Sequence, residues 1–165
     1  MFRSVRLLQG ISGRLYLHSM PGRRESWDDF VGEAKQQGID VIVCLTSDDE
    51  IQEKSPAYAN AISNNLLSCK REAYPIPDYG VPEYQGVFAV FITRIAELLH
   101  SGSAVLAHCG AGIGRTGTFA FCLLIALGMN RELSERTIRD AGSYPETPEQ
   151  VSLVDWCEAE FPVRQ

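Results

Sequence analysis

The sequence AVLAHCGAGIGRTG, residues 104–117, joins two different apolar patterns. Residues 104–107 form a short, continuous apolar run, which indicates a strand buried on both faces. From Arg115 to Gly128 apolar residues occupy nearly every face, so this segment is predicted to be a helix deep in the core. A buried strand that passes through a glycine-rich loop into a buried helix is typical of an α/β fold.

Strand-like and helix-like segments alternate on either side of this unit. Strands are predicted at residues 14–18, 39–45 and 71–76, and helices at residues 26–38, 56–67, 83–100, 134–141 and 147–161. Ser26 and Thr147 are candidate helix caps, and Pro148 suits the first helical position. We therefore predict one α/β domain over residues 1–165, with a central, mostly parallel sheet flanked by helices.

Composition and charge narrow the class of protein. The chain has 165 residues, 45% hydrophobic and 22% charged, which is typical of one soluble domain. Its net charge of −6 disfavours a nucleic-acid binder, which needs a basic face. Residues 119–129 form the most apolar run, far shorter than the roughly 20 residues of a membrane span. No secretory signal is evident, so we expect a cytoplasmic monomer that binds neither nucleic acid nor membrane.

The cysteines and histidines show no metal-binding pattern. The five cysteines lie far apart without a C-x-x-C pair, and the three histidines lack metal-ligand spacing. We therefore predict no metal site, no disulfide framework and no cofactor.

The glycine-rich loop carries the chemistry of the sequence. Three glycines within five residues allow the backbone to curl and to point successive N–H groups inward, at the start of a helix. Such a cradle binds anions without a net positive charge on the protein. The predicted cradle residues are Gly110, Ala111, Gly112, Ile113 and Gly114.

Cys109 and Arg115 lie at the two ends of this cradle. The N–H groups, the helix dipole and the guanidinium all favour the thiolate form of Cys109, which is the nucleophilic form. Arg115 offers a planar fork that fits two phosphate oxygens. A nucleophile, an anion cradle and a bidentate clamp are what phosphoryl transfer to sulfur requires.

The order His-Cys, five residues, then Arg-Thr-Gly resembles the signature of the cysteine-dependent protein-tyrosine and dual-specificity phosphatases. The resemblance extends from residue 39 to just beyond residue 150 and is strongest to the compact dual-specificity branch, which includes the kinase-associated phosphatase. It implies a phosphocysteine intermediate and a phosphorylated protein or peptide as substrate. The Asn-Arg-Tyr loop of the larger tyrosine-specific enzymes is absent, which implies a shallower pocket and a broader choice of substrate.

The same resemblance implies a general acid on a mobile loop upstream of the cysteine. Asp78 lies at the centre of the turn-rich segment YPIPDYGVP, 31 residues before Cys109, and is our candidate. Glu83 is the second candidate. An aspartate in such a turn can also serve only to shape the loop.

Three further residues have supporting roles implied by the family. Thr116 carries a hydroxyl that assists the thiolate as a leaving group, and it can also bond at the helix start. His108 is expected to be buried and to orient the loop rather than to act as a base. Gln150 aligns with a glutamine that positions water, although simple helix capping explains it nearly as well. Where many members carry another glutamine, this chain has Glu146.

Cys44 lies near the end of the strand that we expect beside the cysteine loop. In some relatives a cysteine in such a strand traps the oxidised nucleophile as a disulfide, so Cys44 is a candidate redox partner of Cys109. A buried core thiol is the simpler interpretation.

Other phosphate-loop proteins fit less well. The Gly-Lys-Ser/Thr ending of an ATP loop is missing, and a rhodanese-like sulfur carrier does not account for Arg-Thr-Gly. A phosphoinositide phosphatase usually has lysines inside the loop, whereas the five residues between Cys109 and Arg115 are uncharged. An RNA 5′-phosphatase is disfavoured by the acidic balance. A phosphoprotein-binding pseudophosphatase would lack the nucleophile, the clamp or the acid, and none of these is missing.

Overall fold

The computed structural model describes residues 1–162, so the last three residues of the predicted domain lie outside it. Within these residues one sheet of five strands has the order β1-β2-β5-β3-β4. The strands are β1 (Arg3–Val5), β2 (Arg14–His18), β3 (Val41–Cys44), β4 (Lys70–Ala73) and β5 (Ala104–His108). All neighbours are parallel except β1, which runs antiparallel to β2. The predicted mostly parallel sheet is confirmed.

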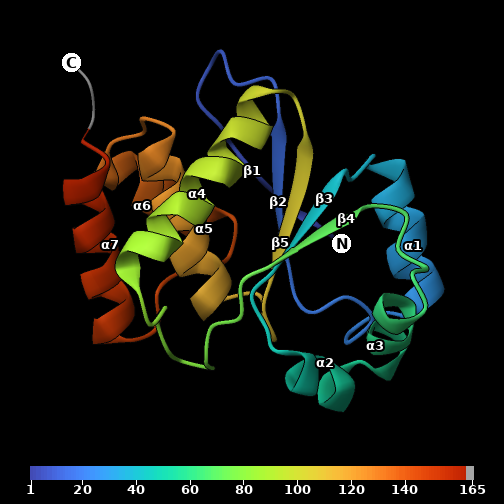
Figure 1. The fold of residues 1–165 in the computed structure, drawn as a ribbon. Coiled ribbons are helices and arrows are strands. Elements are labelled where there is room, and N and C mark those ends of the chain that lie inside the picture. The colour runs from blue at the N-terminus through green and yellow to red at the C-terminus, as the bar shows by residue number, and fades with distance from the viewer. Residues whose placement is uncertain (163–165) are drawn as a thin grey trace.

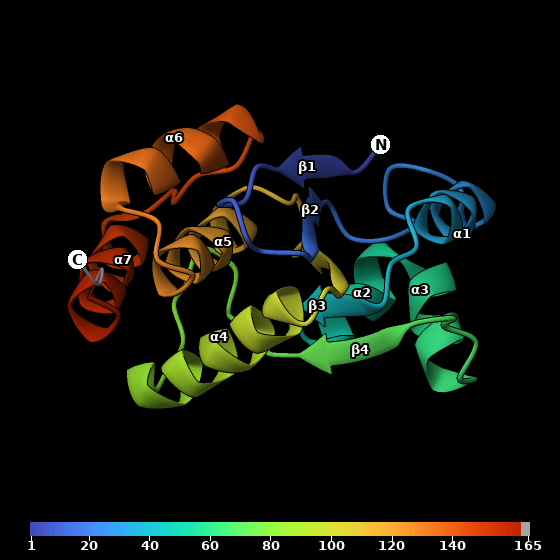
Figure 2. The same cartoon turned by 90° about the horizontal axis from the view of Figure 1, so that it is seen from above.

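Helices cover both faces of the sheet (Figures 1 and 2). On one face lie α1 (Trp27–Gln36) and α3 (Pro56–Ser63), and on the other lie α4 (Gln85–His100), α5 (Gly114–Ala126), α6 (Arg131–Asp140) and α7 (Pro148–Glu160). The short helix α2 (Asp48–Lys54) follows the carboxyl end of β3. The two faces of each strand supply two cores: Val105 packs with the α4 and α5 side, and Leu106 packs with α1.

Helix α5 lies at the centre of the larger core. Its residues from Gly114 to Ile125 are all buried, which confirms the prediction of a helix that is apolar on every face. Burial on all sides fixes the start of α5 firmly, and that start borders the glycine-rich loop.

The predicted helix caps are present. Ser26 Oγ accepts a hydrogen bond from the Asp29 amide at 3.1 Å, and Thr147 Oγ1 accepts one from the Gln150 amide at 3.2 Å. Gly38, just beyond α1, has a left-handed φ of +63°, which glycine adopts without strain.

The structure differs from the sequence prediction in several elements. Strand β1 and helix α2 were not predicted, because β1 is too short to show alternation and α2 buries only Ile51. Helix α6 begins three residues earlier than predicted, because Asn130 Oδ1 caps it by accepting from the Leu133 amide. Strand β4 and helix α3 end earlier than predicted, at Ala73 and Ser63. Among the described residues no helix is long and apolar enough to cross a membrane.

Candidate active site

The loop between β5 and α5 is held from outside by its carbonyl groups. The carbonyl of His108 accepts from the Leu45 amide at 3.1 Å, and that of Gly110 accepts from the Met20 amide at 3.0 Å. The Ile113 carbonyl accepts from the Tyr144 amide at 3.2 Å. Because these carbonyls bond outward, N–H groups are left to face the inside of the loop. The Gly112 amide does so and donates to Cys109 Sγ at 3.3 Å.

Gly112 is the tightest point of the loop. Its φ is +77°, and a Cβ at this position would lie 2.5 Å from the His18 carbonyl oxygen, so only glycine fits. Its own carbonyl accepts from Arg3 Nη2 at 2.6 Å and from Ser143 Oγ at 2.7 Å. The strand β1 thus contributes an arginine that fastens the loop, a role that sequence reasoning did not find.

Cys109 is 2% exposed and lies at a pocket of about 140 Å³. This volume is smaller than the roughly 300–1,000 Å³ of most ligand pockets, and it suits one phosphoryl group. The other lining residues are Arg23, Lys54, Asp78, Tyr79, Ala111, Gly114, Arg115 and Glu146.

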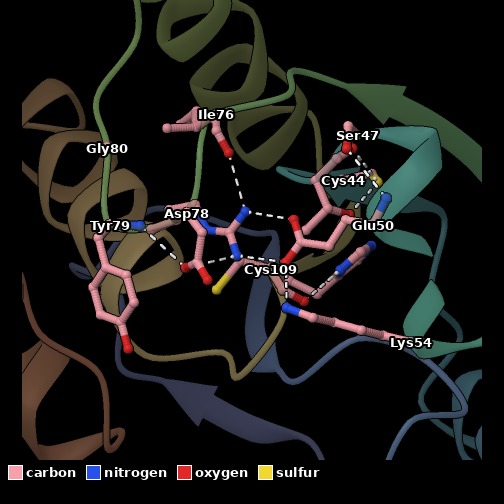
Figure 3. Close-up of polar contacts among 12 residues, drawn as sticks. Cys44, Ser47, Glu50, Lys54, Ile76, Asp78, Tyr79, Gly80 and Cys109 are labelled. Carbon is pink, nitrogen blue, oxygen red and sulfur yellow. Dashed lines mark hydrogen bonds and ion pairs between the residues drawn. The ribbon is translucent and has the colours of Figure 1, made fainter.

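The Arg115 guanidinium is held by two carboxylates and one backbone carbonyl. Glu50 accepts two hydrogen bonds from it, from Nη1 to Oε2 and from Nη2 to Oε1, both 2.8 Å long. Nη1 also donates to the Ile76 carbonyl at 3.0 Å, and Nη2 forms an ion pair with Asp78 Oδ1 at 3.1 Å. Glu50 and Asp78, both labelled in Figure 3, therefore contact the same guanidinium.

The Arg115 hydrogen bonds lower the pKa of Glu50 to about 2, against the opposing effect of burial, and Lys54 Nζ adds a bond of 2.8 Å to Oε1. Glu50 therefore remains an anion at any pH near neutrality, and it holds the arginine side chain in one position. Sequence reasoning missed Glu50, because it is one of three consecutive acidic residues at the start of α2.

Asp78 lies where a general acid could reach the pocket. It is in a tight turn in which the Gly80 amide donates to the Pro77 carbonyl at 2.8 Å, and Tyr79 has a left-handed φ of +59°. Asp78 Oδ1 also accepts from the Tyr79 amide at 3.1 Å. The carboxylate thus both shapes the turn and contacts Arg115. Glu83, the second candidate, is exposed and does not line the pocket.

Gln150 is fully buried and joins two loops. Its Oε1 accepts from the Glu146 amide at 2.7 Å, and its Nε2 donates to the Gly80 carbonyl at 3.2 Å. The side chain therefore connects the Asp78 turn to the turn before α7. Both polar ends bond to backbone groups, an arrangement that sequence reasoning, which considered water positioning or capping, did not anticipate.

A buried network lies beneath the loop. His108 Nε2 is 2.9 Å from the Tyr58 hydroxyl, and its Nδ1 is 3.1 Å from the Cys109 carbonyl oxygen. The Thr116 hydroxyl is buried and has no hydrogen-bond partner among residues 1–162. An unpaired buried hydroxyl retains its full capacity to donate to a neighbouring anion.

Cys44 lies beside His108 on the neighbouring strand β3. Burial raises its pKa, but the charge and hydrogen bonding of His108, together with bonds to Thr46, outweigh burial and lower it to about 6. Its Sγ is 3.5 Å from Thr46 Oγ1. Cys44 and Cys109 are both free thiols in this structure.

Within residues 1–162 no group of three or more histidine, cysteine or acidic side chains could hold a metal ion.

A mostly parallel sheet, with a cysteine loop leading into a buried helix and an arginine at its first turn, defines the class of cysteine-dependent phosphatases. The comparisons agree: residues 11–153 match the family model PTP-SAK, described as a Swiss Army Knife protein, DSP-PTPase phosphatase domain. The chain belongs to this family. The match covers most of the chain with the DSP-PTPase phosphatase domain that this model describes.

Solved structures show the same fold. The kinase-associated phosphatase with a substitution of its catalytic cysteine to serine superposes with a TM-score of 0.83 at 19% identity, over 100% of this chain and 97% of that one. Tk-PTP in the active form gives 0.72 at 24% identity, over 95% and 97% of the two chains. PTPMT1 in complex with PI(5)P gives 0.69 at 14% identity, over 89% and 91%.

Curated relatives match over shorter segments. The Lar-like tyrosine-protein phosphatase of Caenorhabditis elegans is 43% identical over 44 residues, which is 26% of this chain and 2% of that protein. The receptor-type tyrosine-protein phosphatase S of Gallus gallus is 36% identical over 63 residues, 38% of this chain and 4% of that protein. The chain thus spans a few per cent of the length of these relatives.

Proposed function

We propose that residues 1–165 form one catalytic domain, a cytoplasmic monomer that hydrolyses phosphotyrosine, and also phosphoserine or phosphothreonine, in proteins. The reaction passes through a phosphocysteine intermediate. One observation carries the proposal: Cys109 Sγ lies in a phosphate-sized pocket with the Arg115 clamp and the Asp78 carboxylate on its walls.

In the first step the Cys109 thiolate attacks phosphorus, and the bond from phosphorus to the ester oxygen breaks. The loop amides and Arg115 hold the remaining phosphate oxygens, and Asp78 gives its proton to the departing oxygen. In the free protein the Asp78 carboxylate occupies one N–H of Arg115, at 3.1 Å. A phosphate oxygen takes over this N–H on binding, which frees the Asp78 side chain for the leaving group.

In the second step Asp78, now a carboxylate, accepts a proton from the water that attacks phosphorus. The bond from sulfur to phosphorus breaks, and the thiolate leaves. The unpaired Thr116 hydroxyl is available to stabilise that thiolate. Gln150 supports both steps by fixing the Gly80 carbonyl and thereby the Asp78 turn.

Two variants test this mechanism. Cys109→Ser is expected to abolish turnover of a phosphotyrosine peptide while peptide binding persists, because serine is a far weaker nucleophile. Asp78→Asn is expected to lower turnover of the phosphotyrosine peptide by roughly 10²-fold or more, and to lower turnover of an aryl phosphate with a good leaving group much less. Full activity of either variant on phosphotyrosine would contradict the mechanism. Wild-type binding without turnover would identify a pseudophosphatase instead.

A phosphoinositide or another small phosphate ester is the alternative substrate. The fold similarity to PTPMT1 in complex with PI(5)P supports this alternative. The net charge of −6 and the uncharged residues between Cys109 and Arg115 support a protein substrate over a lipid surface. A panel of phosphopeptides and phosphoinositide vesicles, with wild type and Cys109→Ser, separates the two.

We also propose Cys44 as the redox partner of Cys109. Peroxide converts the Cys109 thiolate to sulfenic acid, and the Cys44 thiol then displaces its oxygen as water to form a disulfide. The position of Cys44 beside His108 and its lowered pKa support this role. Mass spectrometry after peroxide treatment should find the Cys44–Cys109 bridge, and sulfonic acid at Cys109 with reduced Cys44 would contradict it.

A further inference from the structure

Three charged groups from two separate segments meet above Gly110, the first residue of the cradle. A Cβ at Gly110 would lie 3.0 Å from Glu50 Oε1, 3.2 Å from Lys54 Nζ and 3.3 Å from Arg23 Nη1. The charged ends of three side chains therefore lie close together over the start of the loop. Arg23 comes from the β2–α1 connection, and Lys54 ends α2, so the fold assembles this cluster.

The positive charge of this cluster exceeds its negative charge. Glu50 already accepts hydrogen bonds from Arg115, and Lys54 bonds to the same carboxylate. The Arg23 guanidinium is exposed and has no side-chain hydrogen bond or ion pair among residues 1–162. Arg23 therefore offers all its donors, and Lys54 offers those not used by Glu50, to an anion at the mouth of the pocket.

The opposite end of the cradle carries the opposite charge. A Cβ at Gly114 would come within 3.0 Å of Glu146 Cδ, so the Glu146 carboxyl group lies against the last cradle residue. Both Arg23 and Glu146 line the Cys109 pocket. A substrate that enters this pocket meets positive charge over Gly110 and negative charge over Gly114, which gives it a preferred orientation.

Resting on the proposed function, we propose that Arg23 and Lys54 form a second anion subsite, which binds an acidic group beside the phosphorylated residue of a peptide substrate. That group is a side-chain carboxylate or a second phosphate. A peptide is favoured over an inositol lipid, because a protein with a net charge of −6 is weakly attracted to an anionic membrane.

The experiment compares phosphotyrosine peptides that differ at one neighbouring position. One set has Asp, Asn or phosphoserine directly before the phosphotyrosine, and the other has them directly after it. Wild type is expected to prefer the acidic peptides over the Asn peptide by roughly tenfold in kcat/KM, mainly through KM, on one of the two sides. Added salt is expected to reduce this preference.

Arg23→Gln is expected to reduce the preference to about twofold, because the unpaired guanidinium is lost. Arg24→Gln is the matched control: it changes the net charge equally at an adjacent exposed residue, but Arg24 lies in a different hollow, with Met1 and His18. The preference is expected to persist in this variant. Lys54→Gln should lower it by a smaller factor than Arg23→Gln does.

Two results would contradict the assignment of this subsite. One is equal kcat/KM for the acidic and Asn peptides in wild type, and the other is an equal loss of preference in Arg23→Gln and Arg24→Gln. Faster turnover of bisphosphorylated inositol lipid vesicles than of the acidic peptides, sensitive to Arg23→Gln, would assign the subsite to lipid and overturn the peptide assignment. Absence of turnover of every peptide and of a small aryl phosphate would instead overturn the proposed function itself.

Discussion

The floor and the rim of the pocket are built in opposite ways. The floor, residues 108–117, is one continuous segment, almost wholly buried, that presents backbone N–H groups and a sulfur atom. The rim consists of side chains from four separate segments, and most of them are exposed and charged: Arg23, Lys54, Asp78, Tyr79 and Glu146.

This difference separates two proposed roles, catalysis by the floor and substrate selectivity by the rim. In the proposed reaction the floor recognises what all phosphate monoesters share, so its geometry has to be rigid and independent of the alcohol. The rim meets the remainder of the substrate, where charge can favour one ester over another. Arg115 belongs to the floor by sequence, but Glu50 holds it from the rim side. The two regions are therefore coupled through two ion pairs of Arg115, one with Asp78 and a shorter one with Glu50.

The largest expected effect comes from breaking the ion pair between Glu50 and Arg115. Glu50→Gln should lower kcat/KM for a small aryl phosphate by roughly 10²-fold, because the clamp loses the group that orients it. The variant should also be less stable at pH 7 by about 2–4 kcal/mol, since it leaves a buried guanidinium without its bidentate partner. Urea unfolding and steady-state kinetics measure both effects.

The pH dependence of this loss has a defined sign. The Glu50 pKa is lowered from 4.5 to about 2 in the folded protein, so its contribution is fully present above pH 4.5 and is lost as pH falls toward 2. The stability difference between wild type and Glu50→Gln should therefore shrink between pH 4.5 and pH 2. Glu53→Gln, at an exposed position of the same helix, is the control. Equal stability at pH 7 would show that Glu50 does not support the floor.

The floor could be predicted from the sequence because it is local. Cys109, three glycines and Arg115 lie within seven residues, and apolar patterns on both sides indicate the strand and helix that hold them. The rim depends on topology, which the sequence does not display. In the sequence nothing distinguishes Glu50 from its acidic neighbours, because only the position of α2 in the fold brings it to Arg115. Arg3 is separated by 109 residues from Gly112, whose carbonyl it binds. Asp78 became a candidate only because the family resemblance implies an acid on a loop upstream of the cysteine.

Alanine substitution of Gly114 and of Gly117, both in α5, compares how easily the surroundings of the two glycines can move. A Cβ at Gly117 would lie 2.8 Å from Tyr144 Cα and against the Tyr144 backbone nitrogen, so the backbone itself would have to shift. Gly117→Ala should therefore cost about 2–4 kcal/mol of stability. At Gly114 the obstacle is only the end of the flexible Glu146 side chain, so Gly114→Ala should change stability by less than about 1 kcal/mol.

Thermal and urea unfolding of both variants decide this comparison. A Gly114→Ala loss as large as that of Gly117→Ala would mean that Glu146 is as immobile as the backbone. In that case the rim would share the rigidity of the floor, and the division between the two regions would fail.

The smallest expected effect concerns the one rim carboxylate at the Gly114 end. Glu146 lines the pocket in which a phosphate dianion must bind, so the two negative charges repel each other. Glu146→Gln should tighten competitive inhibition by inorganic phosphate by roughly threefold at low salt, a gain that shrinks at high salt because the site is open to solvent. Glu149→Gln removes the same charge from an exposed position in the first turn of α7, outside the pocket lining, and controls for net charge. If the two variants bind phosphate equally, Glu146 acts only through the overall charge of the protein. If Glu146→Gln binds phosphate more weakly, Glu146 does not repel the anion, and the charge asymmetry between the two ends of the cradle is wrong.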